Sequence, residues 1–190
     1  MNFKFAKLDY ADFPLMLKWL KTAHVHRWWN PEITWTAELI QKRYGDYVNG
    51  YKRLTLSDGI VQKIIEKPVS AFIMMINDER IGYIQLYNAY DFPRAQGGVL
   101  RDLPKNLAAI DLFIGETQWT GKGIGPILIT EFAEKNIFKD YDAVFVDPKI
   151  ENIHAIKAYR KAGFKEVESY AETDVVWMVL EKTNDIPPLC

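Results

Sequence analysis

Three glycines at alternating positions separate a strand-like segment from a helix-like one, and this order restricts the fold more than any other feature of the sequence. Residues 108–114 are apolar except for Asp111, as expected of a buried strand. The glycines occupy positions 121, 123 and 125, and residues 123–136 then have helical spacing. Because strand, turn and helix in direct succession form the unit of α/β proteins, we expect that class of fold.

The glycine-rich turn has the composition of an anion-binding loop. It reads Gln118-Trp119-Thr120-Gly121-Lys122-Gly123-Ile124-Gly125. Glycine tolerates positive φ, so such a turn can direct backbone N–H groups inward, and the following helix adds unpaired N–H groups and the positive end of its dipole. No Gly-Lys-Ser/Thr follows, and the spacing is not that of a dinucleotide fingerprint. Two interpretations stay open, a receptor for a pyrophosphate and an ordinary tight turn.

Local patterns assign most of the remaining chain. We expect strands at 2–8, 69–76, 81–87, 108–114, 143–147, 164–168 and 175–181, and helices at 12–21, 36–49, 123–136 and 152–162. Asp12 is expected to cap the first helix, and Gly163 to end the last one. Residues 51–67 have no decisive pattern, and 91–106 read as a loop. This order predicts a single domain over residues 1–190, with a mixed sheet and helices on both of its faces.

Composition excludes several function classes. The formal net charge is −1, which argues against general attraction to nucleic acid or to an anionic membrane. The chain has no apolar run near the roughly 20 residues of a membrane span and no signal-like N-terminus. Its one cysteine, Cys190, permits no internal disulfide. His24 and His26 lack further ligands nearby, so no metal site is expected. We expect a cytoplasmic protein, monomeric or dimeric.

Two segments resemble the GCN5-related N-acetyltransferases, the GNAT family. Gln118-x-x-Gly121-x-Gly123 is similar to the family's Gln/Arg-x-x-Gly-x-Gly/Ala signature, and residues 152–164 to its Asn-…-Tyr-x-Lys-x-Gly-Phe block. Four stretches look most like aminoglycoside 6′-N-acetyltransferases: His24-x-x-x-Trp28-Trp29, Ile81-Gly82-Tyr83, Ile110-Asp111 and Val146-Asp147-Pro148. The resemblance implies the GNAT fold, an α/β structure whose mixed, mostly antiparallel sheet carries helices on both faces. It also implies acetyl transfer from acetyl-CoA to a primary amine of a small molecule, with the 6′-amine of an aminoglycoside antibiotic as the best specific candidate.

The resemblance gives two residues catalytic roles. Asp111 is placed as the general base that deprotonates the acceptor amine, and Tyr159 as the acid that protonates the departing thiolate. Each has a structural alternative. Asp111 would then be a strand residue satisfied by backbone amides, and Tyr159 a packing residue of its helix.

The same resemblance implies the binding residues. Phe113, Ile114, Gln118, Trp119, Thr120, Gly121, Lys122, Gly123, Ile124, Gly125, Asn152 and Tyr159 would hold the coenzyme, and Trp28, Trp29, Asp111 and Asp147 the acceptor. Asn152 is equally suited to cap its own helix, and Asp147 to cap the turn that follows it. For one of the two tryptophans, core packing is the simpler reading.

Three rival functions share part of the resemblance. A siderophore-type acyltransferase would act on a hydroxylysine-like amine, but usually has a His near the position of Asp111. A ribosomal-protein N-terminal acetyltransferase needs an open peptide groove, which a wall of Trp28, Trp29 and Trp35 would obstruct. A sensor that binds acetyl-CoA without turnover is disfavoured because both Asp111 and Tyr159 are present.

Loop 91–106 departs from the pattern of the aminoglycoside enzymes. Its charged residues are Arg94, Arg101 and Lys105 against Asp91 and Asp102. A polycationic drug would prefer carboxylates. Either the loop points away from the acceptor, or the acceptor is not an aminoglycoside.

Overall fold

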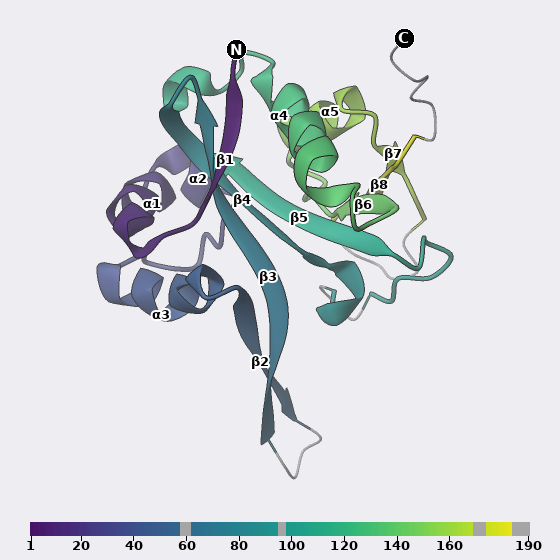
Figure 1. Ribbon diagram of the computed structural model, residues 1–190, viewed down its shortest axis with the longest axis horizontal. Helices are drawn as coiled ribbons and strands as arrows, with labels where there is room; N and C mark the ends of the chain where they lie inside the picture. Colours follow the sequence, from purple (N-terminus) through teal and green to yellow (C-terminus); the bar gives the residue numbers. More distant parts are fainter. Residues whose placement is uncertain (58–61, 95–97, 169–173, 184–190) are drawn as a thin grey trace.

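The computed structural model describes residues 1–57, 62–94, 98–168 and 174–183 (Figure 1). Its strands are β1 (Phe3–Lys7), β2 (Tyr51–Ser57), β3 (Gln62–Ile76), β4 (Glu79–Asn88), β5 (Leu107–Ile114), β6 (Ala143–Val146), β7 (Lys165–Glu166) and β8 (Met178–Glu181). Its α-helices are α1 (Phe13–Leu20), α2 (Ala23–His26), α3 (Ala37–Val48), α4 (Ile124–Phe132) and α5 (Ile153–Lys161). Short helical turns are η1 (Tyr10–Asp12), η2 (Ala89–Asp91), η4 (Thr117–Trp119) and the π-helical η5 (Ala133–Ile137). Cys190 lies outside the described residues, as do 95–97 of the predicted loop.

The sheet confirms the predicted mixed topology. Its strand order is β1-β3-β4-β5-β6-β8-β7, and β2 pairs with β3 beside this path. Only β5 and β6 pair in parallel among the described strands, and this ladder covers just three residue pairs, Leu107↔Ala143 to Ala109↔Phe145. β4 pairs with residues 108–114 of β5 from the other side. Beyond Ala109, the β6-facing edge of β5 therefore has no strand partner within the described chain.

Helices cover both faces of the sheet, α1, α2 and α3 on one and α4 and α5 on the other (Figure 1). Because side chains of a strand alternate between faces, β5 contributes to both layers. Its Ile110 packs with α4 and α5, and Phe113 with the layer that contains Trp19 and Tyr44. The two layers are thus separate apolar cores divided by one sheet.

The ends of the elements follow local chemistry. Thr36 caps α3 by accepting a hydrogen bond from the Leu39 amide at 3.2 Å. Asn152 does the same for α5 through the Ala155 amide, also at 3.2 Å. Gly163 ends α5 with a φ of +97°, as predicted for a left-handed C-cap.

Several predicted boundaries need correction. Among residues 51–67, which had no decisive pattern, 51–57 form β2 and 62–67 begin the 15-residue β3. Asp12 makes no side-chain cap to α1, because its carboxylate accepts from the Asp9 amide and pairs with Arg80. The helix expected over 123–136 changes to a π turn at Ala133. The last two strands are shorter than predicted. Among the described residues, no helix is both long and apolar enough to cross a membrane.

Candidate active site

A cleft of about 750 Å³ opens where β5 and β6 diverge. Residues 110–114 of β5 line one side of the cleft, and Val146 and Asp147 lie at the end of β6. Residues of α4 and α5 form much of the remaining lining. Because the sheet is interrupted here, the cleft is lined both by Tyr159 of the α5 layer and by Trp28 and Trp29, which follow α2 in the other layer. The free edge of β5 offers backbone groups to an extended ligand in the manner of an added strand.

The glycine loop closes one end of this cleft. Gly121 and Gly123 have φ values of +70° and +74°, a region that favours glycine. Gly123 is also the N-cap residue of α4, and no side chain caps this helix, so its first N–H groups remain available. Thr120, Gly121, Gly123, Ile124 and Gly125 line the cleft. This geometry favours the anion-receptor interpretation over an ordinary tight turn.

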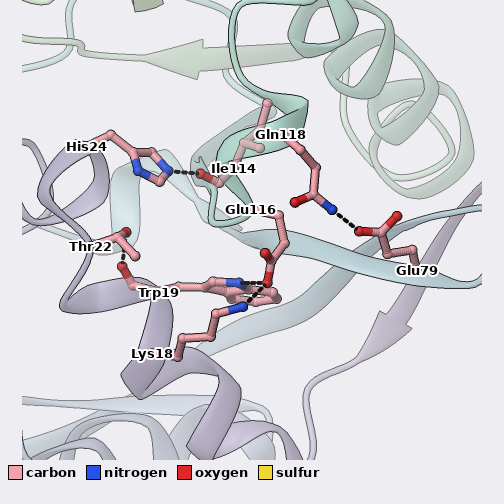
Figure 2. A network of polar contacts seen from close by, with 8 residues as sticks. All are labelled: Lys18, Trp19, Thr22, His24, Glu79, Ile114, Glu116 and Gln118. Carbon is pink, nitrogen blue, oxygen red and sulfur yellow. Dashed lines mark hydrogen bonds and ion pairs between the residues drawn. The ribbon is translucent and has the colours of Figure 1, made fainter.

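Polar contacts with α1 and α2 hold the end of β5 (Figure 2). His24 Nε2 donates to the carbonyl of Ile114 at 3.0 Å. Trp19 Nε1 and Lys18 Nζ donate to the same carboxylate oxygen of Glu116, at 2.8 and 2.6 Å. Gly115 lies against the ring of Trp19, where a Cβ atom would come within 2.2 Å. The position of the end of β5 therefore depends on the helical layer that contains α1 and α2.

Asp111 belongs to a buried chain of hydrogen bonds. Gln85 Nε2 donates to its Oδ2 at 2.7 Å, and Tyr83 donates to Gln85 Oε1 at 2.9 Å. Gln85 and Tyr83 are both buried. The structural alternative for Asp111, satisfaction by backbone amides, is not what the geometry shows, since its partner is a side chain. Asp111 lines the cleft with one oxygen committed to Gln85.

Tyr159 and Asp147 lie on the other side of the cleft. Burial, then the charges of Asp111 and Asp147, raise the pKa of Tyr159, so its phenol stays protonated at neutral pH. Burial, and next the charge of Asp111, raise the pKa of Asp147 to about 6, although the Arg94 guanidinium acts against this. All three groups line the same cleft, and the charge of Asp111 contributes to both raised pKa values.

Arg94 connects loop 91–106 to Asp147, the predicted acceptor carboxylate. Its side chain is buried, donates to the carbonyl of Ala89 at 3.1 Å, and lies 3.6 Å from the carboxylate of Asp147. The guanidinium also rests over the rings of Tyr87 and Phe145. One basic residue of the loop therefore neutralises the predicted acceptor carboxylate, while Arg101 and Lys105 are exposed.

A smaller cavity of about 250 Å³ adjoins the cleft and shares Trp28, Trp29 and Asp111 with it. The remaining residues of its lining are Asn30, Arg43, Tyr44, Tyr47, Lys52 and Gln85. Sequence reasoning missed all six, because they come from α3, β2, β4 and the segment before α3, which only the fold brings together. No local signal marks them.

The structure brings together most predicted site residues. Trp28, Trp29, Asp111, Phe113, Ile114, Trp119, Thr120, Gly121, Gly123, Ile124, Gly125, Asp147, Asn152 and Tyr159 line the main cleft. Asn152 lines the cleft and caps α5, so its capping role is confirmed, while its contact with the coenzyme stays a prediction. Trp29 packs edge-on against Tyr83 and Phe113, which gives it a core role in addition to its place in the lining.

Three predictions are not supported by the placement of the side chains. Gln118 does not line the cleft, and its side chain donates to Glu79, the first residue of β4, at 2.5 Å. Lys122 is also absent from the lining and lies over the ring of Trp119. Trp35 is a buried core residue beside Tyr44 and forms no wall of the site. Within the described ranges, no group of three or more His, Cys, Asp or Glu residues could hold a metal ion.

Comparison with known proteins gives consistent matches. A family model described as an acetyltransferase (GNAT) domain matches residues 49–171. An aminoglycoside N(6′)-acetyltransferase type 1 of Klebsiella pneumoniae is 27% identical over 173 residues, which cover 88% of this chain and 77% of that protein. The aminoglycoside acetyltransferase AAC(6′)-Ib, solved with coenzyme A and kanamycin, superposes with a TM-score of 0.73 at 24% identity, covering 95% of both chains. A spermidine N-acetyltransferase from Vibrio cholerae, solved with CoA and spermine, gives 0.67 at 15% identity over 94% of this chain and 95% of that one.

Proposed function

Because the chain belongs to the GNAT acetyltransferase family, we propose that it transfers the acetyl group of acetyl-CoA to a primary amine of a small molecule. One observation carries the proposal: the open edge of β5 leads from the glycine-capped start of α4 to Asp111 within a single cleft. The names of the similar proteins make the 6′-amine of an aminoglycoside the first acceptor to test.

The residues present fit acetyl-CoA. The N–H groups of the loop at Gly121 to Gly125 would receive the pyrophosphate, and the free edge of β5 at Phe113 and Ile114 would pair with the pantetheine arm. Asn152 would contact the same arm. When bound, acetyl-CoA supplies an activated acetyl thioester, whose carbonyl the β5 amides would polarise.

The acid–base work would fall to Asp111 and Tyr159. An amine arrives mostly protonated at neutral pH, so Asp111 would accept its proton, directly or through a water molecule, and free the lone pair for attack. Gln85 would hold the carboxylate in place by the hydrogen bond to Oδ2. Tyr159 would donate its hydroxyl proton toward the leaving sulfur and recover a proton from solvent. Since burial raises the pKa of Tyr159, the protonated form needed for this role prevails at neutral pH.

Thiol release from acetyl-CoA tests the proposal. The amine panel comprises kanamycin, tobramycin, lysine, hydroxylysine and a peptide that begins with alanine. Turnover with at least one amine is expected, and Asp111→Asn should lower kcat/KM by about 100-fold or more, because an amide cannot accept the proton. The matched control is Asp142→Asn at an exposed position outside the cleft, which should leave kcat/KM unchanged.

The rival functions predict other outcomes of the same assay. Turnover confined to hydroxylysine would favour the siderophore-type enzyme, and turnover confined to the peptide the N-terminal acetyltransferase. Tight binding of acetyl-CoA with no thiol release on any amine would overturn the proposal in favour of a sensor. Tyr159→Phe should retain coenzyme binding while lowering kcat, which separates a role at the sulfur from one in packing.

A further inference from the structure

The cavity beside the main cleft, defined above by its nine lining residues, has an unusual charge balance. Arg43 and Lys52 are its cationic residues, and Asp111 is the one acidic residue in its lining. Asp111 is itself engaged by Gln85. Two cations against one carboxylate leave the cavity at the proposed base with an excess of positive charge.

Neither cation has a carboxylate partner among the residues that the structure describes. Arg43 Nη2 donates to the side-chain oxygen of Asn30 at 3.1 Å, and its guanidinium lies over the ring of Trp35. The ammonium of Lys52 lies 5.3 Å from the centre of the Phe92 ring. Both cations line the same cavity. Burial, and next the charge of Arg43, lower the pKa of Lys52, whereas the charge of Asp111 acts against this shift. Ring faces and an amide oxygen leave most of their charge uncompensated.

Two buried phenols add unused hydrogen-bond donors. Tyr44 accepts from Trp29 Nε1 at 2.8 Å, and its own hydroxyl proton has no acceptor among the described residues. Tyr47 makes no hydrogen bond within the described chain, although its exposed fraction is only 6%. Burial raises the pKa of Tyr44 to about 12 and also raises the pKa of Tyr47, so both phenols remain protonated donors at neutral pH. Both residues line the cavity, so their hydroxyls are available to a ligand rich in acceptor oxygens.

The opposite wall offers no surplus negative charge. Asp147, the predicted acceptor carboxylate, already faces the buried guanidinium of Arg94. The acceptor side of the site thus combines three cations, Arg43, Lys52 and Arg94, with two carboxylates, Asp111 and Asp147. This arrangement suits an anion beside the amine better than several further cations.

We propose that this cavity binds an anionic oxygen group of the acceptor, a carboxylate or a phosphate, between Arg43, Lys52 and the hydroxyls of Tyr44 and Tyr47. The preferred acceptor is then a primary amine that also carries such a group, with its amine at Asp111. This inference rests on the proposed acetyl transfer, and it specifies which amines are the best substrates.

Paired acceptors test the inference directly. Thiol release is measured with ω-amino acids of increasing chain length, from β-alanine to 6-aminohexanoate, each against the alkylamine that lacks the carboxylate. Phosphoethanolamine against ethanolamine gives the phosphate arm. At one chain length, kcat/KM should favour the anionic member by about tenfold or more, since charge-assisted hydrogen bonds form only with that member. The arm with the larger ratio identifies carboxylate or phosphate as the group bound.

Variants assign the preference to the cavity. Arg43→Met and Lys52→Met keep an apolar stem but remove the charge, and each should reduce the anionic-to-neutral ratio by about tenfold. Lys52→Arg should restore part of the preference. Lys42→Met is the matched control: Lys42 neighbours Arg43 on α3 but is exposed and outside the lining, so its ratio should equal that of the wild type.

Equilibrium binding separates failure of the inference from failure of the proposed function. Calorimetry of the coenzyme A-saturated protein compares 6-aminohexanoate with hexylamine, without any need for turnover. A preference for the acid in binding, with no thiol release on any amine, would overturn the acetyl transfer and support the anion site. Equal kcat/KM for anionic and neutral partners, or a higher value for kanamycin than for every anionic amine, would overturn the anion site and leave the acetyl transfer standing.

Discussion

Two acidic residues of the site, Asp111 and Asp147, are held by different kinds of partner. Asp111 accepts from a neutral amide that is itself fixed by Tyr83, whereas Asp147 faces the buried cation Arg94. A neutral donor orients a carboxylate and leaves its negative charge in place, whereas a buried cation compensates that charge. At the residue scale, the first arrangement suits a group that must take up a proton, and the second a group that shapes the pocket.

Gln85 is predicted to act as a positioning residue. Gln85→Leu removes the donor to Asp111, frees the carboxylate to rotate, and leaves the Tyr83 hydroxyl without its acceptor. We expect kcat/KM to fall by about tenfold or more, with the dissociation constant for coenzyme A unchanged. Gln62→Leu, at an exposed position of β3, is the matched control. Equal loss of coenzyme affinity and of kcat/KM would point to general disruption of the sheet instead.

Asp147 should make stability depend on pH. Its carboxyl has a pKa of about 6 in the folded protein, against 3.8 for the unperturbed group. Because the folded state holds this proton more tightly, its contribution to the free energy of unfolding is complete below about pH 4 and is lost as the pH rises through 6. We expect a loss of about 1–3 kcal/mol between these limits.

Urea unfolding from pH 4 to 7.5 measures this effect as a difference between the wild type and Asp147→Asn. The variant cannot titrate at position 147, so its curve should lack the change that the wild type shows as the pH rises through 6. Parallel curves for the two proteins would contradict the predicted titration.

At the scale of single elements, the start of α4 carries the greatest local constraint. Gly123 is both its N-cap and a residue with positive φ, and no side chain occupies the space that the cap leaves. The first N–H groups of α4 face the cleft, and no side chain of the protein caps them. The positive φ at Gly123 and the availability of the N–H groups therefore both result from the tight turn that begins α4.

Replacement of this glycine separates strain from binding. Gly123→Ala should lower the free energy of unfolding by about 1 kcal/mol, since alanine resists positive φ. It should also raise the dissociation constant for coenzyme A by about tenfold, because the loop amides turn away from the anion. Gly50→Ala is the matched control, with a φ of +87° and open space around the new methyl group, outside the cleft. That variant should lose stability alone, and a similar loss of affinity in both would refute the assignment.

Elements with a local signature were predictable from the sequence. Strand β5 and helix α5 were predictable in this way. The apolar run at 108–114 and the helical spacing of apolar residues around Ile156 each mark a buried face within a short segment. The β2–β3 hairpin was not, since most of its described side chains beyond Val69 are exposed and leave no buried face to read. Other features depend on residues that are far apart in the sequence, so no short segment predicts them. These are the pairing of Arg94 with Asp147 and the shared cavity of Arg43 and Lys52.

For the molecule as a whole, the two helical layers and the sheet form the body, and the distal part of the β2–β3 hairpin projects away from it (Figure 1). The projecting segment is paired within itself, from Tyr51↔Pro68 outward. Ile64, for example, is 66% exposed. Stability should therefore depend on the body and very little on this arm.

Shortening the arm tests that division. Arg53 lies opposite Glu66, so residues 54–65 can be replaced by Asn-Gly, which favours a two-residue hairpin turn. We expect a change of less than about 1 kcal/mol in the free energy of unfolding, since little buried apolar surface is lost. Val69→Ala, in the buried half of the same strand, should cost about 1–3 kcal/mol. A larger loss from the shortened arm than from Val69→Ala would show that the arm supports the body.

The short parallel ladder between β5 and β6 has a kinetic consequence. Three residue pairs join the two halves of the sheet there, and a donor bound along the rest of β5 would act as a temporary strand that closes the seam. Amide hydrogen exchange at residues 110–114 should then slow by about tenfold or more when coenzyme A saturates the protein. An acceptor that binds first would enter a site in which the edge of β5 is still unpaired. Initial rates should therefore follow an ordered mechanism in which the acyl donor binds before the amine.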